Sequence, residues 1–139
     1  MTKWKTLFFV LTFVAFNSGS QWSYEGQNGP DNWQGFCQSG LNQSPIDLED
    51  EVFDSGLEPV EFKNYDFKLQ AVNITNNGHT VKINVPVNSQ AEIVIDASET
   101  FRLAQIHFHW GDQSLQGSEH LLHGQAFPLE MHLVHHNIK

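Results

Sequence analysis

The sequence predicts a mainly β fold, and three observations support this prediction. Apolar and polar residues alternate along several short segments, most clearly over residues 81–87 (VKINVPV), as expected of strands whose successive side chains point to opposite faces. Turn-forming residues separate these segments, as at Asn76, Asn77 and Gly78. No segment shows the 3.6-residue periodicity of a helix longer than a turn or two. We therefore expect a meander of strands with few short helices.

Length and composition narrow the class of protein. The chain has 139 residues, of which 40% are hydrophobic and 17% charged, which fits one folded domain and argues against a disordered chain. Its formal net charge is −9. A nucleic-acid-binding protein normally carries the opposite charge, because phosphate contacts need Lys and Arg. Nucleic acid is therefore excluded as a partner.

The first twenty residues have the composition of a secretory signal peptide. Lys3 and Lys5 form a basic head, residues 7–16 (LFFVLTFVAF) form an apolar run too short to span a bilayer, and small residues follow at Ser18 and Ser20. The alternatives are a signal anchor or a buried N-terminal helix. The signal peptide predicts a secreted protein in which residues 1–20 are removed and residues 21–139 form the mature chain.

The next segments are expected to be irregular. Residues 21–45 are rich in Gly, Asn, Gln and Ser, and we expect their aromatic side chains to hold an irregular arm against a larger body: Trp22, Tyr24, Trp33 and Phe36. Residues 47–58 are acidic and are expected to form a surface turn. The predicted strands then cover residues 60–69 with a turn at 63–64, 72–74, 81–87, 92–96, 101–110 and 129–135. Pro86 favours a sheet edge or a strand end.

All eight histidines lie at or beyond position 79, and two of the predicted strands present them in a regular pattern. In the strand 101–110, Gln105, His107 and His109 share one face, and Ile106, Phe108 and Trp110 share the other, expected apolar, face. In the strand 129–135, Glu130, His132 and Val134 share a face. If the two strands are antiparallel neighbours, His132 lies opposite the pair, and three imidazoles are the ligands of a catalytic zinc site with one open position.

Two polar residues strengthen this interpretation. Gln105 and Glu130 each stand two residues before a histidine on the same face, where they can accept an imidazole N–H and fix its orientation. The alternative is that these are surface or half-buried histidines that share no ion, since short metal motifs have many false positives. Other histidines compete as ligands: His120, His123, His135 and His136. The spacing alone leaves both interpretations open.

Six motifs follow one another along the chain: NGPDNW (28–33), NQSPID (42–47), NNGH (76–79), FRLAQIHFHWG (101–111), GSEH (117–120) and LEMHLVHHN (129–137). In these motifs and their order, the chain resembles the α-class carbonic anhydrases over nearly all of residues 21–139. The resemblance implies a large twisted, mostly antiparallel central sheet with few short helices. It also implies a Zn²⁺ cofactor held by His107, His109 and His132, with Gln105 and Glu130 as their outer partners.

The resemblance assigns further roles, residue by residue. His79 corresponds to the proton-shuttling histidine, and Glu119 to a glutamate that orients a threonine beside the zinc-bound hydroxide. Tyr24 and Asn77 correspond to polar positions along the active-site water chain. Val134 corresponds to part of the apolar wall that receives carbon dioxide.

The implied activity is that of a carbonic anhydrase, a carbonate dehydratase of the lyase class. Zinc lowers the pKa of its bound water to about 7, and the hydroxide attacks carbon dioxide to give bicarbonate and a proton. An imidazole suits the export of that proton, since it titrates near neutral pH. Carbon dioxide and bicarbonate are thus the expected small-molecule partners.

Two departures from the family pattern affect these expectations. Lys82 places a cation where many members have a neutral group, which puts the efficiency of the His79 shuttle in question. The sequence also stops at Lys139, soon after the third ligand, whereas family domains are longer, so we expect an N-terminal portion of a domain and a partial sequence rather than a natural half-domain.

The lone cysteine and the function each leave alternatives open. In a secreted protein Cys37 is a free buried thiol, an intermolecular link or half of a bridge, and the resemblance implies a disulfide half whose partner is missing. The threonine that pairs with Glu119 is missing as well.

The alternatives to a zinc-dependent enzyme are a non-catalytic carbonic anhydrase-like zinc-binding module and an inactive truncated fragment.

Overall fold

A computed structural model describes residues 22–95, 98–112 and 116–139. The predicted signal peptide over residues 1–20 lies outside these ranges. The described chain forms a six-stranded sheet and a separate two-stranded sheet, with one four-residue helix, α1 (Phe36–Ser39), and 3₁₀ turns at Gly26–Asn28 and Pro30–Asn32. None of its helices has the length and apolar character needed to cross a bilayer. The mainly β, mostly antiparallel fold class is therefore confirmed.

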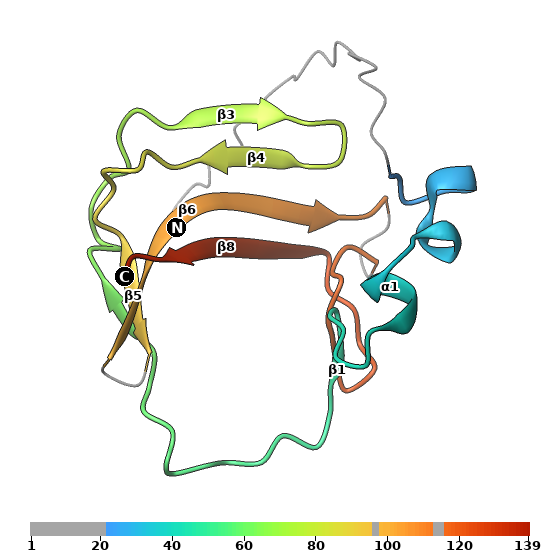
Figure 1. Cartoon of the computed structure of the whole chain (residues 1–139), viewed down its shortest axis with the longest axis horizontal. Helices are drawn as coiled ribbons and strands as arrows, with labels where there is room; N and C mark the ends of the chain where they lie inside the picture. The colour runs from blue at the N-terminus through green and yellow to red at the C-terminus, as the bar shows by residue number, and fades with distance from the viewer. Residues whose placement is uncertain (1–21, 96–97, 113–115) are drawn as a thin grey trace, which may run out of the picture.

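The large sheet is built around its longest strand. Its members are β2 (Glu61–Lys63), β3 (Asn73–Asn76), β4 (Val81–Asn84), β5 (Glu92–Ile95), β6 (Glu99–Trp110) and β8 (Leu129–Asn137). The order is β2-β5-β6-β4-β3, with β8 paired to β6, and all of these pairs are antiparallel. Figure 1 shows β3, β4, β6 and β8 one beside the next. The antiparallel pairing of β6 with β8 is the condition on which the predicted histidine cluster depends.

Strand β6 changes partner along its length. Phe101 and Arg102 pair with β5 on one side and with β8 on the other, whereas residues 105–107 pair with β4 on the side that β5 has left. A β-bulge lies at this point, because Leu103 is opposite His135 and Gln105 is opposite the next residue, Val134. Such a bulge adds one residue to one strand and increases the local bend. It lets a single strand join two others that diverge.

The small core lies on the face of the sheet opposite the predicted site. Leu103, only 2% exposed, packs with Val85 and Ala91, and partly buried side chains surround them: Tyr65, Leu69, Ile106 and Leu133. Leu103 and Ile106 share this core although they are three residues apart, because the bulge accommodates the extra residue. Beyond the bulge strict alternation returns, so Gln105, His107 and His109 face the other way.

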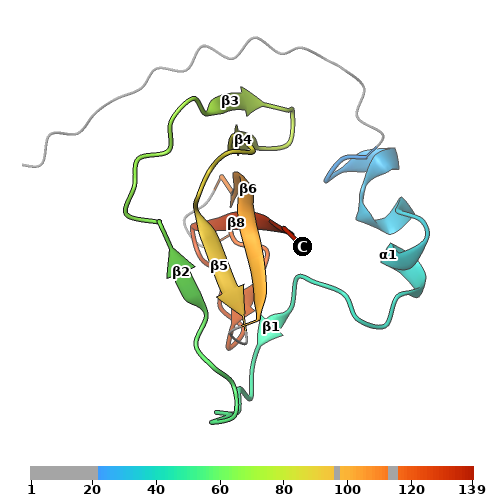
Figure 2. The ribbon, with the colours of Figure 1, turned by 60° about the vertical axis from the view of Figure 1, so that its left-hand side comes forward.

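The N-terminal arm is irregular, as predicted, and lies beside the sheet with α1 (Figure 2). Trp22 attaches it to the sheet: the indole stacks on the imidazole of His79 with ring centroids 3.8 Å apart, and Trp33 and Tyr24 pack edge-on against the same indole. Phe36 does not contribute to this attachment, since it is 83% exposed.

Several local predictions were wrong. Strand β2 ends at Lys63, and residues 65–69 form no strand, because Asn64 has a positive φ of 60° and its side-chain amide donates to the carbonyl of Gln90. Asp47 is not in a turn: β1 (Asp47–Leu48) pairs in parallel with β7 (Leu121–Leu122), and the Asp47 carboxylate accepts the N–H of Gly124. Both contacts join residues distant in sequence, which local patterns do not reveal.

The remaining strand boundaries follow the sequence more closely. Strand β4 ends at Asn84, three residues short of the predicted end at residue 87, in keeping with the preference of Pro86 for a strand end. Strand β8 runs two residues beyond its predicted end, to Asn137. Trp110 lies on the face that was expected to be apolar, and its side chain is 51% exposed.

Candidate metal centre

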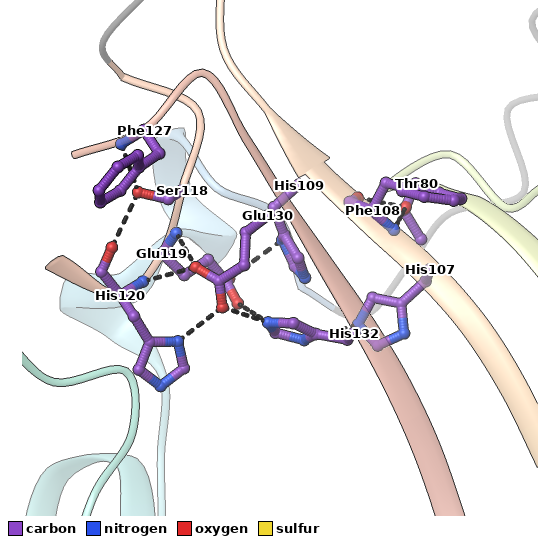
Figure 3. Close-up of polar contacts among 10 residues, drawn as sticks. All are labelled: Thr80, His107, Phe108, His109, Ser118, Glu119, His120, Phe127, Glu130 and His132. Carbon is purple, nitrogen blue, oxygen red and sulfur yellow. Dashed lines mark hydrogen bonds and ion pairs between the residues drawn. The ribbon is translucent and has the colours of Figure 1, made fainter. Parts of the chain in front are cut away.

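The register of two strands brings the three predicted histidines together. His107 on β6 pairs directly with His132 on β8, and His109 pairs with Glu130. Directly opposite residues share a face of the sheet, so His132 faces the same side as His107 and His109. Figure 3 shows the three imidazoles pointing toward one another in front of these strands. The predicted position of His132 opposite the pair is confirmed.

The distances between the rings fit a shared ion. The ring centroids lie 5.1 Å apart for His107 and His109, 4.8 Å for His107 and His132, and 4.6 Å for His109 and His132. Nε2 of His107 is 3.1 Å from Nδ1 of His132. Tetrahedral zinc with bonds of 2.0–2.1 Å places two ligand nitrogens about 3.3 Å apart. One ligand atom from each histidine lies within 4.8 Å of the others, so these donors fit a tetrahedral metal ion.

Glu130 binds the third histidine and much of its surroundings. Its Oε1 lies 2.5 Å from Nε2 of His132 and 2.6 Å from Nδ1 of His120, and its Oε2 accepts the N–H groups of Glu119 (2.9 Å) and His120 (2.8 Å). Burial raises the pKa of this carboxyl. The backbone N–H of His120 and the hydrogen bonds with the two imidazoles lower the pKa by more, so that its net value is about 2. Glu130 is therefore ionised at neutral pH and leaves Nδ1 of His132 facing His107.

The other two histidines are half-buried and have different surroundings. Nδ1 of His109 lies 3.2 Å from Oε1 of Glu119, and its Nε2 is buried with no hydrogen-bond partner among the described residues. Nδ1 of His107 and Oε1 of Gln105 are buried and unpartnered in the same way. The expected Gln105–His107 hydrogen bond is thus absent, although Glu130 makes the corresponding bond with His132 at the same spacing.

Partial burial favours the neutral form of the His107 and His109 imidazoles. It lowers the pKa of both His107 and His109, and the neighbouring imidazoles lower both further, against the opposing effect of the Glu119 carboxylate. Lys82 adds to the lowering at His107, which it faces across the β4–β6 pair. Neutral imidazole is the form that binds a metal ion, so these surroundings favour binding near neutral pH.

A tight turn places His79 in the lining of a cavity that His107 and His109 also line. Asn77 Oδ1 accepts the N–H groups of His79 (3.0 Å) and Thr80 (2.9 Å), and Gly78 takes a φ of +90°, which favours glycine. The turn is fixed to β6 by Thr80, whose hydroxyl donates to the carbonyl of Phe108 (2.5 Å) and accepts its N–H (3.1 Å). The oxygen of Asn77 is therefore committed to the turn, although Asn77 was expected along the water chain.

The cavity itself has a volume of about 180 Å³. Residues of the N-terminal arm, the turn after β3 and strands β4 and β6 line it: Trp22, Tyr24, Asn77, His79, Thr80, Lys82, Gln105, His107 and His109. Burial raises the pKa of the Tyr24 phenol, and the Glu119 carboxylate raises it further. Tyr24 thus stays protonated at neutral pH. Val134 faces the same side of the sheet as His132 and is 37% exposed.

Sequence reasoning missed two contacts at this centre. His120 was only a competing ligand, yet it is hydrogen-bonded to Glu130 and forms with Glu130 and His132 a second group with metal-ligand spacing. Because Glu130 already accepts four hydrogen bonds, we interpret that group as a hydrogen-bond network. Glu119 was expected to orient a threonine, and in the described residues it contacts His109. Cys37 is exposed and forms no disulfide, so it is not a buried thiol.

Comparison with known proteins identifies the family. The model of eukaryotic-type carbonic anhydrases matches residues 28–139. The chain belongs to the carbonic anhydrase family. It is 38% identical to carbonic anhydrase 12 of Homo sapiens over 126 residues, which are 86% of this chain and 35% of that protein. Over 126 residues it is 37% identical to a carbonic anhydrase of Klebsiella pneumoniae, covering 86% of this chain and 47% of the relative.

A third relative gives the same proportions. Carbonic anhydrase 7 of Mus musculus is 36% identical over 124 residues, which cover 85% of this chain and 46% of the relative. The carbonic anhydrase-like chain thus spans between about a third and a half of the length of these relatives.

Proposed function

We propose that this chain supplies the zinc-binding part of an enzyme that reversibly hydrates carbon dioxide to bicarbonate and a proton. One observation carries the proposal: three half-buried imidazoles from β6 and β8 converge at ligand spacing in a chain of the carbonic anhydrase family. His107, His109 and His132 hold the metal. Bound zinc supplies a Lewis acid that makes water a nucleophile at neutral pH.

The surrounding residues take the remaining roles in this proposal. Glu130 orients His132 through the 2.5 Å contact with its Nε2. Gln105 takes the same role at His107 when its unpartnered Oε1 turns to the unpartnered Nδ1 of that histidine. His79 passes the proton from the cavity it shares with His107 and His109 to solvent. Tyr24, which also lines that cavity, and Asn77 order water there, and Val134 provides an apolar surface for carbon dioxide.

The test is carbon dioxide hydration by the expressed chain, followed in a stopped-flow instrument with a pH indicator. Activity that is abolished by a chelator and restored by zinc, and that is lost in H107A, supports the proposal. H123A is the matched control, because His123 lies away from the three histidines and contacts Glu51 (3.4 Å). Hydration that persists unchanged in H107A after chelation contradicts a role for this centre.

A zinc-binding module without turnover is the second candidate. Glu119, which is expected to orient a threonine, instead contacts His109, and Val134 is 37% exposed where an enclosed carbon dioxide pocket needs a covered wall. Under this alternative the chain binds zinc through the same histidines but leaves the hydration rate at the uncatalysed value. Calorimetric zinc titration beside the stopped-flow assay separates the two candidates.

Export from the cell is part of the proposal. The basic head, the apolar run over residues 7–16 and the small residues that follow support a signal peptide with cleavage after Ser20. The test is expression of the whole chain in a secreting cell and N-terminal sequencing of the protein in the medium. A product that stays inside the cell with residues 1–20 attached contradicts this part.

A further inference from the structure

Strand β3 contains an acceptor motif for N-linked glycosylation. Asn73, Ile74 and Thr75 fit the pattern Asn-X-Ser/Thr, in which the middle residue is not proline. All four residues of β3 are exposed, so the Asn73 amide and the Thr75 hydroxyl are both accessible. In the same segment Asn76 and Asn77 use their side-chain oxygens to accept backbone N–H groups of the turn that follows. Asn73 has no part in that turn.

Strand β3 also forms an edge of the large sheet. In the described part of the chain it pairs with β4 alone, and Figure 1 shows it as the outermost strand on that side. An edge strand presents unpaired backbone N–H and C=O groups, to which another chain can add a strand. Its sequence is NITN, and Ile74 is 63% exposed. This edge therefore invites pairing with a second molecule.

The usual protection of a sheet edge is missing from β3. Edges are commonly protected by charged side chains, by proline or by a bulge that twists the strand away. None of the four residues of β3 is charged or proline, and their register with β4 is regular from Asn73 to Asn76. A bulky, hydrophilic group attached to this strand would supply the protection that its own side chains do not.

The register places the acceptor motif on the side of the sheet away from the core. Thr75 pairs with Lys82, and Lys82 pairs with His107, so Thr75 shares the face of the histidines. Asn73, two residues earlier in the strand, lies on the same face. Because neighbouring strands are about 4.8 Å apart, β3 lies roughly 10 Å from β6. A glycan on Asn73 thus leaves the packing of the core undisturbed.

We propose that Asn73 carries an N-linked glycan that covers the β3 edge. This inference rests on the proposed export of the chain and is independent of the zinc site. The co-reactant is an oligosaccharide joined to a lipid diphosphate. Nδ2 of Asn73 bonds to the anomeric carbon of the first sugar, the bond from that carbon to the diphosphate oxygen breaks, the lipid diphosphate leaves with the bonding electrons, and the amide loses one proton to a base. The product is a bulky, solubilising surface group.

A second acceptor motif provides an internal comparison. Asn42, Gln43 and Ser44 fit the same pattern and are exposed in the loop between α1 and β1. Pro45 follows directly, and a proline restricts the backbone of the residue before it. No proline adjoins the motif at Asn73, which is the less constrained of the two. We therefore expect the glycan at Asn73.

The test is expression of the whole chain in a secreting eukaryotic cell and mapping of the protein from the medium. Peptide N-glycosidase in ¹⁸O-labelled water converts a glycosylated asparagine to labelled aspartate. Trypsin then releases residues 69–82, whose fragment masses locate the label. We expect labelled aspartate at position 73 in the unaltered chain and in T75S, which keeps the hydroxyl. We expect no label in T75V or N73Q.

Light scattering of the purified proteins tests the covering of the edge. N73Q should associate faster than N42Q, which changes the other motif and leaves β3 as it is. Equal rates would show that a glycan on Asn73 does not protect the edge. If N73Q does not fold, T75V and T75S give the same comparison.

A chain from the medium with unmodified Asn73, or with a glycan on Asn42 alone, refutes the inference. Failure of export is recognised separately, because the chain then stays in the cell with residues 1–20 attached. In that case the same chain is expressed behind the signal peptide of another secreted protein. Unmodified Asn73 in that product refutes the glycan, whereas labelled aspartate at position 73 upholds it although the proposed export has failed.

Discussion

The Glu130 network allows a stability prediction whose magnitude follows from the structure. The fold lowers the pKa of this carboxyl from its ordinary value of 4.5 to about 2, and one pKa unit corresponds to about 1.4 kcal/mol, so ionised Glu130 stabilises the fold by at most roughly 3 kcal/mol, and by about 1–2 kcal/mol once solvent screening is taken into account. Replacing it with alanine also leaves the N–H groups of Glu119 and His120 without their acceptor. We expect E130A to lower the free energy of unfolding at pH 7 by about 3 to 5 kcal/mol.

The pH dependence gives the same prediction a second test. Because the pKa of Glu130 is lower in the folded chain, its stabilisation is complete above the unfolded pKa, near 4.5, and is lost as pH falls toward 2. Urea denaturation of the metal-free chain, followed by tryptophan fluorescence from pH 7 to 3, measures the difference between E130A and the unaltered chain. That difference is expected to shrink below pH 4.5.

The control is E61Q, which affects an exposed contact with Lys63 (3.6 Å) and should change stability by less than about 0.5 kcal/mol. A loss below about 1 kcal/mol for E130A at pH 7, or a loss that stays constant down to pH 3, would refute the reasoning.

Four further predictions concern the cluster, the core and the arm. H107A should reduce zinc affinity by more than the roughly 100-fold that outer partners produce, measured by chelator competition; a smaller loss would argue against His107 as a ligand. L103A should cost about 2–5 kcal/mol in urea denaturation, because Leu103 is 2% exposed in the core, and a cost under 1 kcal/mol would contradict that packing. W22A should move the ring proton resonances of His79 downfield, since an indole stacked at 3.8 Å shields them, and unchanged resonances would show that the stack is absent in solution. Because burial lowers the pKa of His107 and His109, the unfolded chain binds more protons in acid, so the metal-free chain should lose stability as pH falls from 7 to 5; H107A should lose less, and equal slopes would contradict the buried, neutral state.

The period of two in a strand, with the assumed antiparallel pairing of two strands, predicted which side chains meet at the centre of the site. It placed His107 and His109 on one face of β6, and the pairing with β8 put His132 opposite them. Glu130 follows from the same rule, since it stands two residues before His132 and reaches its ring. These relations depend on the geometry of one strand or one strand pair, which the residue pattern records directly.

Contacts that depend on the path of a connection were not predictable in this way. Glu119 reaches His109 only because the segment after β6 is tied to Phe127 and Glu130, and no local pattern specifies those bonds. The missing strand after Lys63 has a similar origin, since Asn64 takes a positive φ and bonds with Gln90. The sequence identified His120 only as a competing ligand and did not predict its hydrogen bond with Glu130.

The bulge in β6 also determines where this strand tolerates a change of length. Loss of Ala104 alone would restore simple alternation and leave Leu103 and the imidazole of His107 on the sides they now occupy. Loss of Ile106 would instead make Gln105 and His107 adjacent, so that one of these two side chains would have to point toward the core. A single-residue deletion at the bulge therefore leaves the histidine cluster intact. A single-residue deletion between Gln105 and His107 disrupts it.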